Sequence, residues 1–324
     1  MHPEAEFRPL NKEFLDRNGD QCFDIYIKAL QDGEVKFVLF AGKAAEHQAK
    51  VRQLLQIGAL KEDLYFHEDD RDQYFSQASK RLKKLADNEK VPLHRKAQKI
   101  YSVSKELMQE FFDYNAADSV LGVADEVLEI MEGVVSQSDQ GFASVAEHLI
   151  RDYHVYTHSV NVAMYCISYG IQTKMDKADI RVLGLGGMFH DLGLSRIPQE
   201  IVYKKGSLDD EEMGNVQGHP KIGVEILEGM KRYELPVMQI VGQHHEDCNG
   251  NGYPKGANKQ EISLLSRICK VADVYDSMVS PRKYRKAMSP MEALTLMTQN
   301  LRDTFDLAIV RNFIVMLGPT VRKG

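Results

Sequence analysis

The chain has 324 residues, of which 43% are hydrophobic and 27% are charged, and its formal net charge is -6 at pH 7. This length exceeds what one hydrophobic core usually organises, so we expect two domains in an ordinary soluble globular protein. The acidic balance argues against binding to long nucleic acid, which requires a broad basic surface.

The sequence shows no pattern that predicts a membrane or secreted protein. The N-terminus has no basic segment followed by an apolar stretch, so no signal peptide is expected. No apolar run approaches the roughly 18 residues that span a bilayer. The four cysteines lie scattered without CxxC spacing, which argues against a zinc ribbon or a disulfide framework. We therefore expect a reduced, cytoplasmic protein with no membrane partner.

Residues 1–90 are expected to form a small α+β domain. Residues 22–30 and 35–41 are rich in isoleucine, valine, phenylalanine and tyrosine, and Asp32-Gly33 between them supplies the turn of a β-hairpin. The segment has no phosphoacceptor cluster, glycine-rich phosphate loop or recognisable cofactor motif. A sensor, a docking surface for a signalling partner and a homodimerisation module therefore all stay open as its role. Two helices are predicted within it, over residues 43–57 and 69–85.

Residues 91–145 are predicted to be a helical connector. Apolar residues recur at spacings of three and four over residues 100–114, as on the buried face of an amphipathic helix. Asn115 and Gly122 predict a break between two helices. Because few charge pairs of the kind that flank a coiled-coil seam are present, we favour packing against the chain's own core over a signalling helix or a dimer seam.

Residues 146–324 are predicted to form an all-helical bundle, because strand-like alternation is rare and apolar residues recur at helical spacing. Ser289 is a suitable N-cap and Pro290 a suitable first helical residue. The expected fold is therefore mainly α, with a C-terminal all-helical bundle and a smaller α+β N-terminal domain. Helices of the bundle are predicted over residues 155–167, 180–189, 222–227, 264–278, 290–300 and 307–317.

Histidines and aspartates with the chemistry of metal ligands gather in this bundle. Imidazole and carboxylate groups suit borderline divalent metals, and two metals that share a carboxylate are a common device for phosphodiester hydrolysis. A single such histidine is more often an ordinary core or surface residue, so the inference depends on their co-occurrence. The candidate ligands are His158, His190, Asp191, His219, His244, His245 and Asp273.

The adjacent pair His190-Asp191 can be analysed further from its sequence. Neighbouring residues in a helix point about 100° apart, so each of the two could face a different metal or share one. A carboxylate has two oxygens and can bridge two cations, whereas a neutral imidazole serves as a terminal ligand. Gly193, two residues later, would let the backbone turn sharply or approach another segment closely.

The pair His244-His245 is expected to end a helix. It opens a glycine-rich loop in which Gly250 and Gly252 would permit left-handed backbone conformations. Cys248 lies beside the pair, and we interpret it as a small loop residue rather than a metal ligand.

Together these ordered motifs resemble the HD-GYP family of the HD phosphohydrolase superfamily. The resemblance covers residues 158–317, roughly half of the chain. The matching motifs are His158-Ser159-Val160-Asn161-Val162-Ala163, His190-Asp191-Leu192-Gly193, Ile197-Pro198, His219-Pro220-Lys221-Ile222-Gly223, His244-His245-Glu246, Gly250-x-Gly252-Tyr253-Pro254, Val271-Ala272-Asp273-Val274-Tyr275-Asp276, Arg282-Lys283-Tyr284-Arg285-Lys286 and Phe305-Asp306.

The resemblance implies an HD-type bundle that hydrolyses cyclic-di-GMP to linear pGpG or GMP. The attacking water would be activated by two divalent metals, with iron or manganese as the implied pair. Asp191 would bridge the metals and, with His190, form the catalytic pair. One metal would take His158, His190, Asp191 and Asp273, and the other Asp191, His219, His244 and His245. The implied substrate contacts are Tyr253, Arg282, Arg285 and Lys221.

Three positions depart from the family pattern. Leu194 replaces the lysine that commonly follows the His-Asp-x-Gly element and reaches a substrate phosphate. His154 replaces the glutamate that three-metal members carry one turn before the first ligand histidine, which favours a two-metal centre. Asn249 replaces a frequently acidic loop residue, with little expected effect because asparagine is equally suited to a turn.

Two alternatives to a cyclic-di-GMP phosphodiesterase therefore stay open. The first is a catalytically weak or inactive receptor that keeps the metals and the pocket but signals by binding. Leu194, in place of the phosphate-contacting lysine, suggests this alternative. The second is a hydrolase of another cyclic dinucleotide or nucleotide. The complete set of metal ligands favours an enzyme over a receptor.

Overall fold

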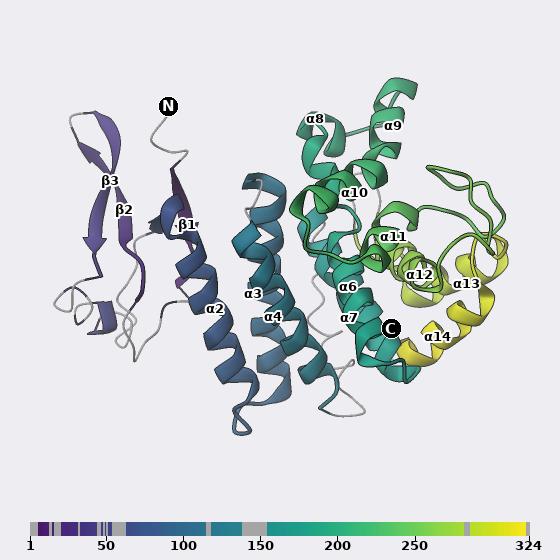
Figure 1. Cartoon of the computed structure of the whole chain (residues 1–324), viewed down its shortest axis with the longest axis horizontal. Coiled ribbons are helices and arrows are strands. Elements are labelled where there is room, and N and C mark those ends of the chain that lie inside the picture. The colour runs from purple at the N-terminus through teal and green to yellow at the C-terminus, as the bar shows by residue number, and fades with distance from the viewer. Residues whose placement is uncertain are drawn as a thin grey trace. The chain divides into compact units, whose positions relative to one another are not determined.

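The structure is a computed structural model, and it describes residues 6–12, 15, 21–31, 33–43, 47, 49, 51–53, 63–114, 118–137, 154–281 and 286–321. The chain divides into two compact units. The first comprises residues 1–89 with 119–123, and the second comprises residues 90–118 with 124–324. Figure 1 traces the elements of both units along the chain.

The first unit contains a four-stranded antiparallel sheet with strand order β1-β4-β2-β3. The hairpin predicted from the sequence is confirmed: Gln31 lies opposite Glu34, and Gly33 turns the chain with a φ of 82°. Asp32, the other predicted turn residue, lies outside the described residues. The strands are β1 (Phe7–Leu10), β2 (Ile25–Gln31), β3 (Glu34–Ala41) and β4 (Leu64–His67).

Helix α2 (Arg71–Ala86) confirms the helix predicted over residues 69–85. Its buried residues recur at helical spacing and pack against the sheet. Tyr74 stacks on Phe66 of β4, with ring centroids 4.3 Å apart, and also meets the edge of Phe23. Most of the helix predicted over residues 43–57 lies outside the described residues, although residues 51–53 are helical.

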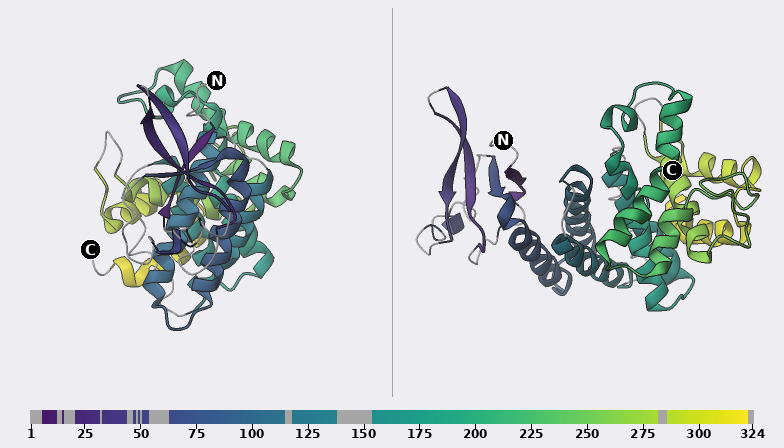
Figure 2. Two further views of the ribbon diagram at one scale, coloured as in Figure 1. Left: turned by 90° about the vertical axis from the view of Figure 1, so that its left-hand side faces the viewer. Right: turned by 45° about the horizontal axis from the view of Figure 1, so that its top comes forward.

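The second unit is a helical bundle, and the fold is therefore mainly α with a smaller sheet, as the sequence predicts. The helices predicted for the bundle are confirmed, and short helices are added between them (Figures 1 and 2). The elements are α3 (Leu93–Tyr114), α4 (Asp118–Val135), α6 (Val155–Gln172), α7 (Lys177–Phe189), η4 (Leu192–Arg196), α8 (Gln199–Val202), α9 (Asp210–Gln217), α10 (His219–Met230), α11 (Leu235–Gln243), α12 (Leu264–Val279), α13 (Pro290–Gln299) and α14 (Leu307–Val321).

Helix α6 forms the centre of this bundle. It contacts α3, α7, α12 and α14, and its residues from Val155 to Gly170 are buried almost without interruption. A helix that is surrounded on all sides has little polar face to expose, so the polar side chains that it does bury require partners. His158 and Asn161 are two of these buried polar residues.

Local signals read from the sequence also set helix ends. Ser289 caps α13 by accepting a hydrogen bond from the backbone N–H of Glu292, and Pro290 occupies the first turn, as predicted. Helix α11 ends at Gln243, so the pair His244-His245 follows its last turn, as predicted. In the part of the chain that the structure describes, no helix is both long and apolar enough to cross a membrane.

Candidate metal centre

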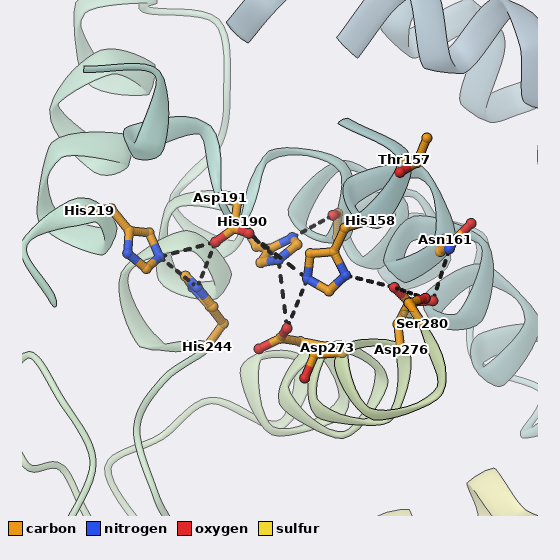
Figure 3. Close-up of polar contacts among 12 residues, drawn as sticks. Thr157, His158, Asn161, His190, Asp191, His219, His244, Asp273, Asp276 and Ser280 are labelled. Atoms are coloured by element: carbon orange, nitrogen blue, oxygen red, sulfur yellow. Dashed lines mark hydrogen bonds and ion pairs between the residues drawn. The ribbon is translucent and has the colours of Figure 1, made fainter. Parts of the chain in front are cut away.

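Two groups of histidine and aspartate side chains converge in the second unit (Figure 3). Within each group, the potential ligand atoms all lie within 4.8 Å of one another. The residues come from α6, from the ends of α7 and α11, from the first turn of α10 and from α12. The first group is His158, His190 and Asp273, and the second is Asp191, His219, His244 and His245.

The first group is centred on Asp273. Its Oδ1 lies 3.0 Å from Nε2 of His158 and 4.0 Å from Nε2 of His190. In the second group, Nε2 of His219 lies 3.1 Å from Nε2 of His244. Two nitrogen ligands about 2.1 Å from one metal lie roughly 3 Å apart, so this spacing suits a shared cation.

Asp191 joins the two groups. Its Oδ2 lies 3.3 Å from Nε2 of His190 and 3.9 Å from Nε2 of His158. Its Oδ1 lies 3.2 Å from Nε2 of His219 and 3.7 Å from Nε2 of His244. One carboxylate therefore presents a separate oxygen to each group, which is the arrangement that a bridging ligand requires.

The backbone around His190 and Asp191 differs from the expectation of two successive helical residues. His190 ends α7 with φ -54° and ψ -39°, whereas Asp191 has φ -95° and ψ 7° and begins the 3-10 turn η4. The different directions of the two side chains therefore arise where one helix stops and another turn begins. The expectation of a helical 100° separation is wrong in this respect.

Three of the histidines are oriented by the same backbone contact. In each, Nδ1 lies within hydrogen-bonding distance of the carbonyl oxygen three residues earlier, at the end of a helical segment. When Nδ1 carries the proton and donates it, Nε2 presents its lone pair to the centre. The pairs are His190 with Gly187 at 2.8 Å, His219 with Val216 at 2.6 Å and His244 with Val241 at 2.8 Å.

The donor set fits a metal. Nε2 of His190 is buried, and although it lies 3.3 Å from Oδ2 of Asp191, its geometry makes no hydrogen bond to any described residue. A buried polar atom without a partner is costly, and a metal ligated by this nitrogen would remove that cost. Mixed imidazole and carboxylate donors in two groups suit two borderline divalent cations.

His158 is oriented differently, by Asp276 and Asn161, which are not among the predicted site residues. Its Nδ1 lies 2.7 Å from Oδ2 of Asp276, and Asn161 donates to Oδ1 of the same carboxylate at 2.9 Å. The signal was available in the spacing: Asp276 follows Asp273 by three residues, and Asn161 follows His158 by three, so each pair shares a helix face. A carboxylate behind a ligand histidine fixes its tautomer and its ring orientation.

The two groups hold protons differently. Burial disfavours a charged His158, but hydrogen bonds to Asp273 and Asp276 outweigh burial and raise its pKa to about 10. Burial likewise disfavours a charged His190, but the negative charge of Asp191 prevails and raises its pKa to about 9. In the second group, burial lowers the pKa of His244 to about 4. His158 and His190 are therefore protonated at neutral pH, whereas His244 is neutral.

The pKa values of Asp191, Asp273 and His245 are shifted as well. Burial alone would raise the pKa of Asp191, but the charge of His190 and hydrogen bonds from the surrounding histidines hold it well below its usual range. The pKa of Asp273 is lowered in the same way, chiefly through His158. Burial and the neighbouring His244 hold the pKa of His245 well below its usual range. Both carboxylates are therefore anionic at neutral pH.

Metal binding is expected to release protons from the first group. Because His158 and His190 must lose a proton before Nε2 can bind a cation, the apparent affinity should rise with pH. The rise is up to about tenfold per pH unit for each proton released, and it should level off as pH passes the raised pKa values. Titration calorimetry of metal-stripped protein with Mn²⁺ at pH 7, in buffers of different ionisation enthalpy, counts the protons. Binding of two metals without proton release would contradict this expectation.

Gly193 allows the turn that follows Asp191 to pack closely against α10. A side-chain carbon added at Gly193 would lie 2.0 Å from the backbone oxygen of His219 and 2.8 Å from the backbone nitrogen of Gly223. The predicted close backbone approach is therefore confirmed. It brings the turn that follows Asp191 directly against the first turn of α10, which carries His219.

The loop after His245 is held by backbone contacts. Gly250 has a φ of 79°, as predicted, but Gly252 is not left-handed. Gly252 is required for space instead, because an added carbon there would lie 2.3 Å from the backbone nitrogen of Asp247. The carboxylate of buried Glu246 accepts hydrogen bonds from the backbone of the loop, at Lys255 (2.7 Å) and Ala257 (2.8 Å).

Two of the four predicted substrate contacts, Tyr253 and Lys221, lie in the part of the chain that the structure describes. The ring of Tyr253 stacks on His245 with centroids 4.6 Å apart, beside the second group. Lys221 is exposed on α10, and its Nζ lies 3.9 Å from Oε1 of Glu225. Arg282 and Arg285 lie outside the described residues.

The positions that depart from the family pattern, Leu194, His154 and Asn249, belong to neither ligand group. Leu194 is half-buried in η4. His154 precedes α6 in an extended conformation, so helical spacing does not align it with His158, and its ring stacks on Tyr156. Cys248 belongs to neither group. Lys204, which follows α8, is paired with Glu212.

Comparison with known protein families matches the HD domain at residues 144–309, more than half of the chain. The chain belongs to the HD domain family. The match contains every residue of both histidine and aspartate groups.

Several proteins similar to this chain are named as phosphodiesterases. The chain is 32% identical over 195 residues to the cyclic di-GMP phosphodiesterase PA4108 of Pseudomonas aeruginosa, covering 60% of this chain and 47% of that protein. It is 36% identical over 149 residues to the 3'3'-cGAMP-specific phosphodiesterase 3 of Vibrio cholerae, covering 46% of this chain and 32% of that protein. The chain thus matches less than half the length of these relatives. The predicted relationship to this group of HD domain proteins is confirmed.

A solved structure shares the fold. The chain is similar to Bd1817, an HDG"Y"P protein from Bdellovibrio bacteriovorus, with a TM-score of 0.66 and 18% sequence identity. The match covers 97% of this chain and all of that chain.

Proposed function

We propose that this protein is a metal-dependent phosphodiesterase that hydrolyses cyclic-di-GMP to linear pGpG or GMP. The observation that carries the proposal is the carboxylate of Asp191, which presents one oxygen to each of two ligand groups. The cyclic-di-GMP phosphodiesterase PA4108 supports it as a relative at 32% identity. HD domain membership alone would leave the substrate class open.

The proposed ligands divide into two sets with one shared member. His158, His190 and Asp273 would hold one cation, and His219, His244 and His245 the other, with Asp191 bound to both. Mixed nitrogen and oxygen donors support iron or manganese. When bound, such a pair supplies an activated water and neutralises charge on the phosphoryl oxygens.

The chain's own residues would place the substrate beside this centre. Tyr253 stacks on His245 and offers an aromatic surface for a nucleotide base. Burial raises the pKa of Tyr253, so its hydroxyl remains protonated at neutral pH and can donate a hydrogen bond to a phosphate. Arg282 and Arg285 remain proposed phosphate contacts because their forked donors suit phosphate oxygens.

A second candidate substrate is another cyclic dinucleotide. The relative that is 36% identical is named for its specificity toward 3'3'-cGAMP, so the shared site supports both cyclic dinucleotides. Leu194 supports a third possibility, a receptor, because an aliphatic side chain cannot pair with a substrate phosphate. The complete ligand groups favour hydrolysis over binding alone.

The test is hydrolysis by anaerobically purified protein loaded with iron or manganese. We expect chromatography to show linear pGpG or GMP from cyclic-di-GMP, with no product from the same protein after metal removal. Parallel reactions with 3'3'-cGAMP should show a lower kcat/KM. Faster hydrolysis of 3'3'-cGAMP would replace the proposed substrate. Binding without product in protein that holds about two metals per chain would instead establish a receptor.

A further inference from the structure

A chain of buried hydrogen bonds runs from α3 to a proposed metal ligand. The hydroxyl of Tyr101 on α3 donates to Oδ1 of Asn161 on α6 at 3.0 Å. Asn161 donates through Nδ2 to Oδ1 of Asp276 on α12 at 2.9 Å, and Oδ2 of Asp276 lies 2.7 Å from Nδ1 of His158. All four residues are buried, and Figure 3 shows the contacts that link Asn161, Asp276 and His158. We call these four residues the Tyr101 chain.

We propose that Tyr101 is a positioning residue for the metal centre, through which α3 fixes the orientation of His158. The proposal rests on the proposed function in one respect, namely that His158 binds a metal. Its core is that the Tyr101 hydroxyl anchors the amide of Asn161, whose other end holds Asp276.

The amide of Asn161 has one donating end and one accepting end. The carboxylate of Asp276 only accepts, so it takes the Nδ2 end, and the Tyr101 hydroxyl donates to Oδ1 at the other end. Without that hydroxyl, the amide keeps one of these two hydrogen bonds, and the buried Oδ1 loses the donor that Tyr101 supplies. A buried acceptor that loses its donor is costly, so Asn161 would shift, and Asp276 would lose its fixed partner.

Asp276 passes this constraint to the metal ligand. Its Oδ2 faces Nδ1 of His158, while Nε2 of the same ring faces Asp273 in the first ligand group. A carboxylate that holds Nδ1–H keeps Nε2 as the metal-binding nitrogen and keeps the ring in one orientation. Displacement of Asp276 therefore loosens His158 without removing a ligand.

Helix α3, which carries Tyr101, contacts two elements that hold proposed metal ligands or follow them directly. Helix α3 packs against α6, which carries His158, and also against η4, the turn that follows Asp191. It begins at Leu93, just after the boundary between the two compact units. A displacement of α3 would therefore reach His158 through the Tyr101 chain.

The test compares Tyr101→Phe with Tyr169→Phe in the full-length protein. Phenylalanine keeps the ring and removes only the hydroxyl. Tyr169 is a matched control because it is a buried tyrosine of α6 whose hydroxyl accepts a hydrogen bond from Asn312 at 3.3 Å, outside the Tyr101 chain. Manganese affinity is measured by competition with a chelator, separately from hydrolysis.

We expect Tyr101→Phe to weaken one of two bound manganese ions by about tenfold, with the other ion and the Tyr169→Phe protein near wild type. Hydrolysis should fall through kcat, and added manganese should restore part of it. Equal affinities in Tyr101→Phe and wild type would overturn the proposal. Equal losses in both variants would also overturn it, because they would indicate a general packing effect.

A metal-independent measurement separates this proposal from the proposed function. In metal-stripped protein with ¹⁵N-labelled histidine, Tyr101→Phe should shift the ring nitrogen signals of one histidine, whereas Tyr169→Phe should not. This result stands even if wild-type protein binds no manganese, an outcome that would reject the proposed function alone. Unshifted histidine signals in Tyr101→Phe would overturn the positioning role.

Discussion

Replacing Asp191 with asparagine should remove both metals' shared ligand and abolish phosphodiester hydrolysis. The Asp191 carboxylate lies 3.3 Å from His190 and 3.2 Å from His219 through different oxygens, so one substitution affects both ligand groups. Asparagine keeps the size but offers a neutral oxygen on one side and an N–H group on the other. Charge stabilisation by metals is worth several kcal/mol, so we expect kcat/KM to fall by at least about a thousandfold.

The matched control for this variant is Asp125→Asn. Asp125 is also paired with two basic side chains, Arg181 at 2.7 Å and Arg232 at 3.4 Å, but it belongs to neither ligand group. Metal content by elemental analysis should drop in Asp191→Asn and stay near two per chain in Asp125→Asn. Full metal content in Asp191→Asn would mean that the two groups bind independently, and the bridging role would be rejected.

Much of the fold and the ligand set could be predicted because the relevant signals are local. Amphipathic spacing places α6, α7 and α12, and Ser289-Pro290 marks the start of α13. The candidate ligands could be named because histidines and aspartates co-occur in one predicted bundle, in ordered motifs that resemble those of a known family. The structure brings all seven of them together in two groups.

The parts that could not be predicted depend on contacts between distant segments. Spacing places Asp276 on the helix face of Asp273, but Asp276 and His158 are 118 positions apart and Tyr101 and Asn161 are 60 apart, so no local pattern predicts these contacts. The break between His190 and Asp191 was missed because both residues can continue a helix, whereas the turn that follows packs against α10, a segment distant in the sequence.

Glycine shows the same division between local and distant causes. The positive φ of Gly33 follows from a hairpin that the sequence reveals. Gly252 was expected to be left-handed, yet it is needed because the backbone of Asp247 and His245 lies where a side chain would be. Local sequence thus predicts where a glycine is present for conformation, and tertiary packing decides where it is present for space.

The Gly193→Ala variant should separate the second ligand group from the first. The added methyl would lie 2.0 Å from the His219 oxygen and 2.8 Å from the Gly223 nitrogen, and both are backbone atoms of α10 that cannot rotate away. Either η4 or α10 must move, so His219 should retreat from Asp191. We expect a loss of about 3 kcal/mol in the free energy of unfolding, which is the upper range for overpacking, together with weaker binding of the metal at His219.

Gly229→Ala is the matched control, because the same substitution on α10 itself meets no heavy atom within 4 Å beyond its own stretch of helix. Alanine there should stabilise the helix by up to about 1 kcal/mol, since it has the higher helix propensity. Denaturant unfolding of metal-stripped protein measures the packing cost, and manganese titration of folded protein measures the displacement of His219. If Gly193→Ala unfolds like Gly229→Ala, the close approach of η4 to α10 does not exist in solution. If it is less stable but binds both metals normally, the contact stabilises the bundle without positioning His219. Only the combined loss supports a turn that holds Asp191 and His219 at bridging distance.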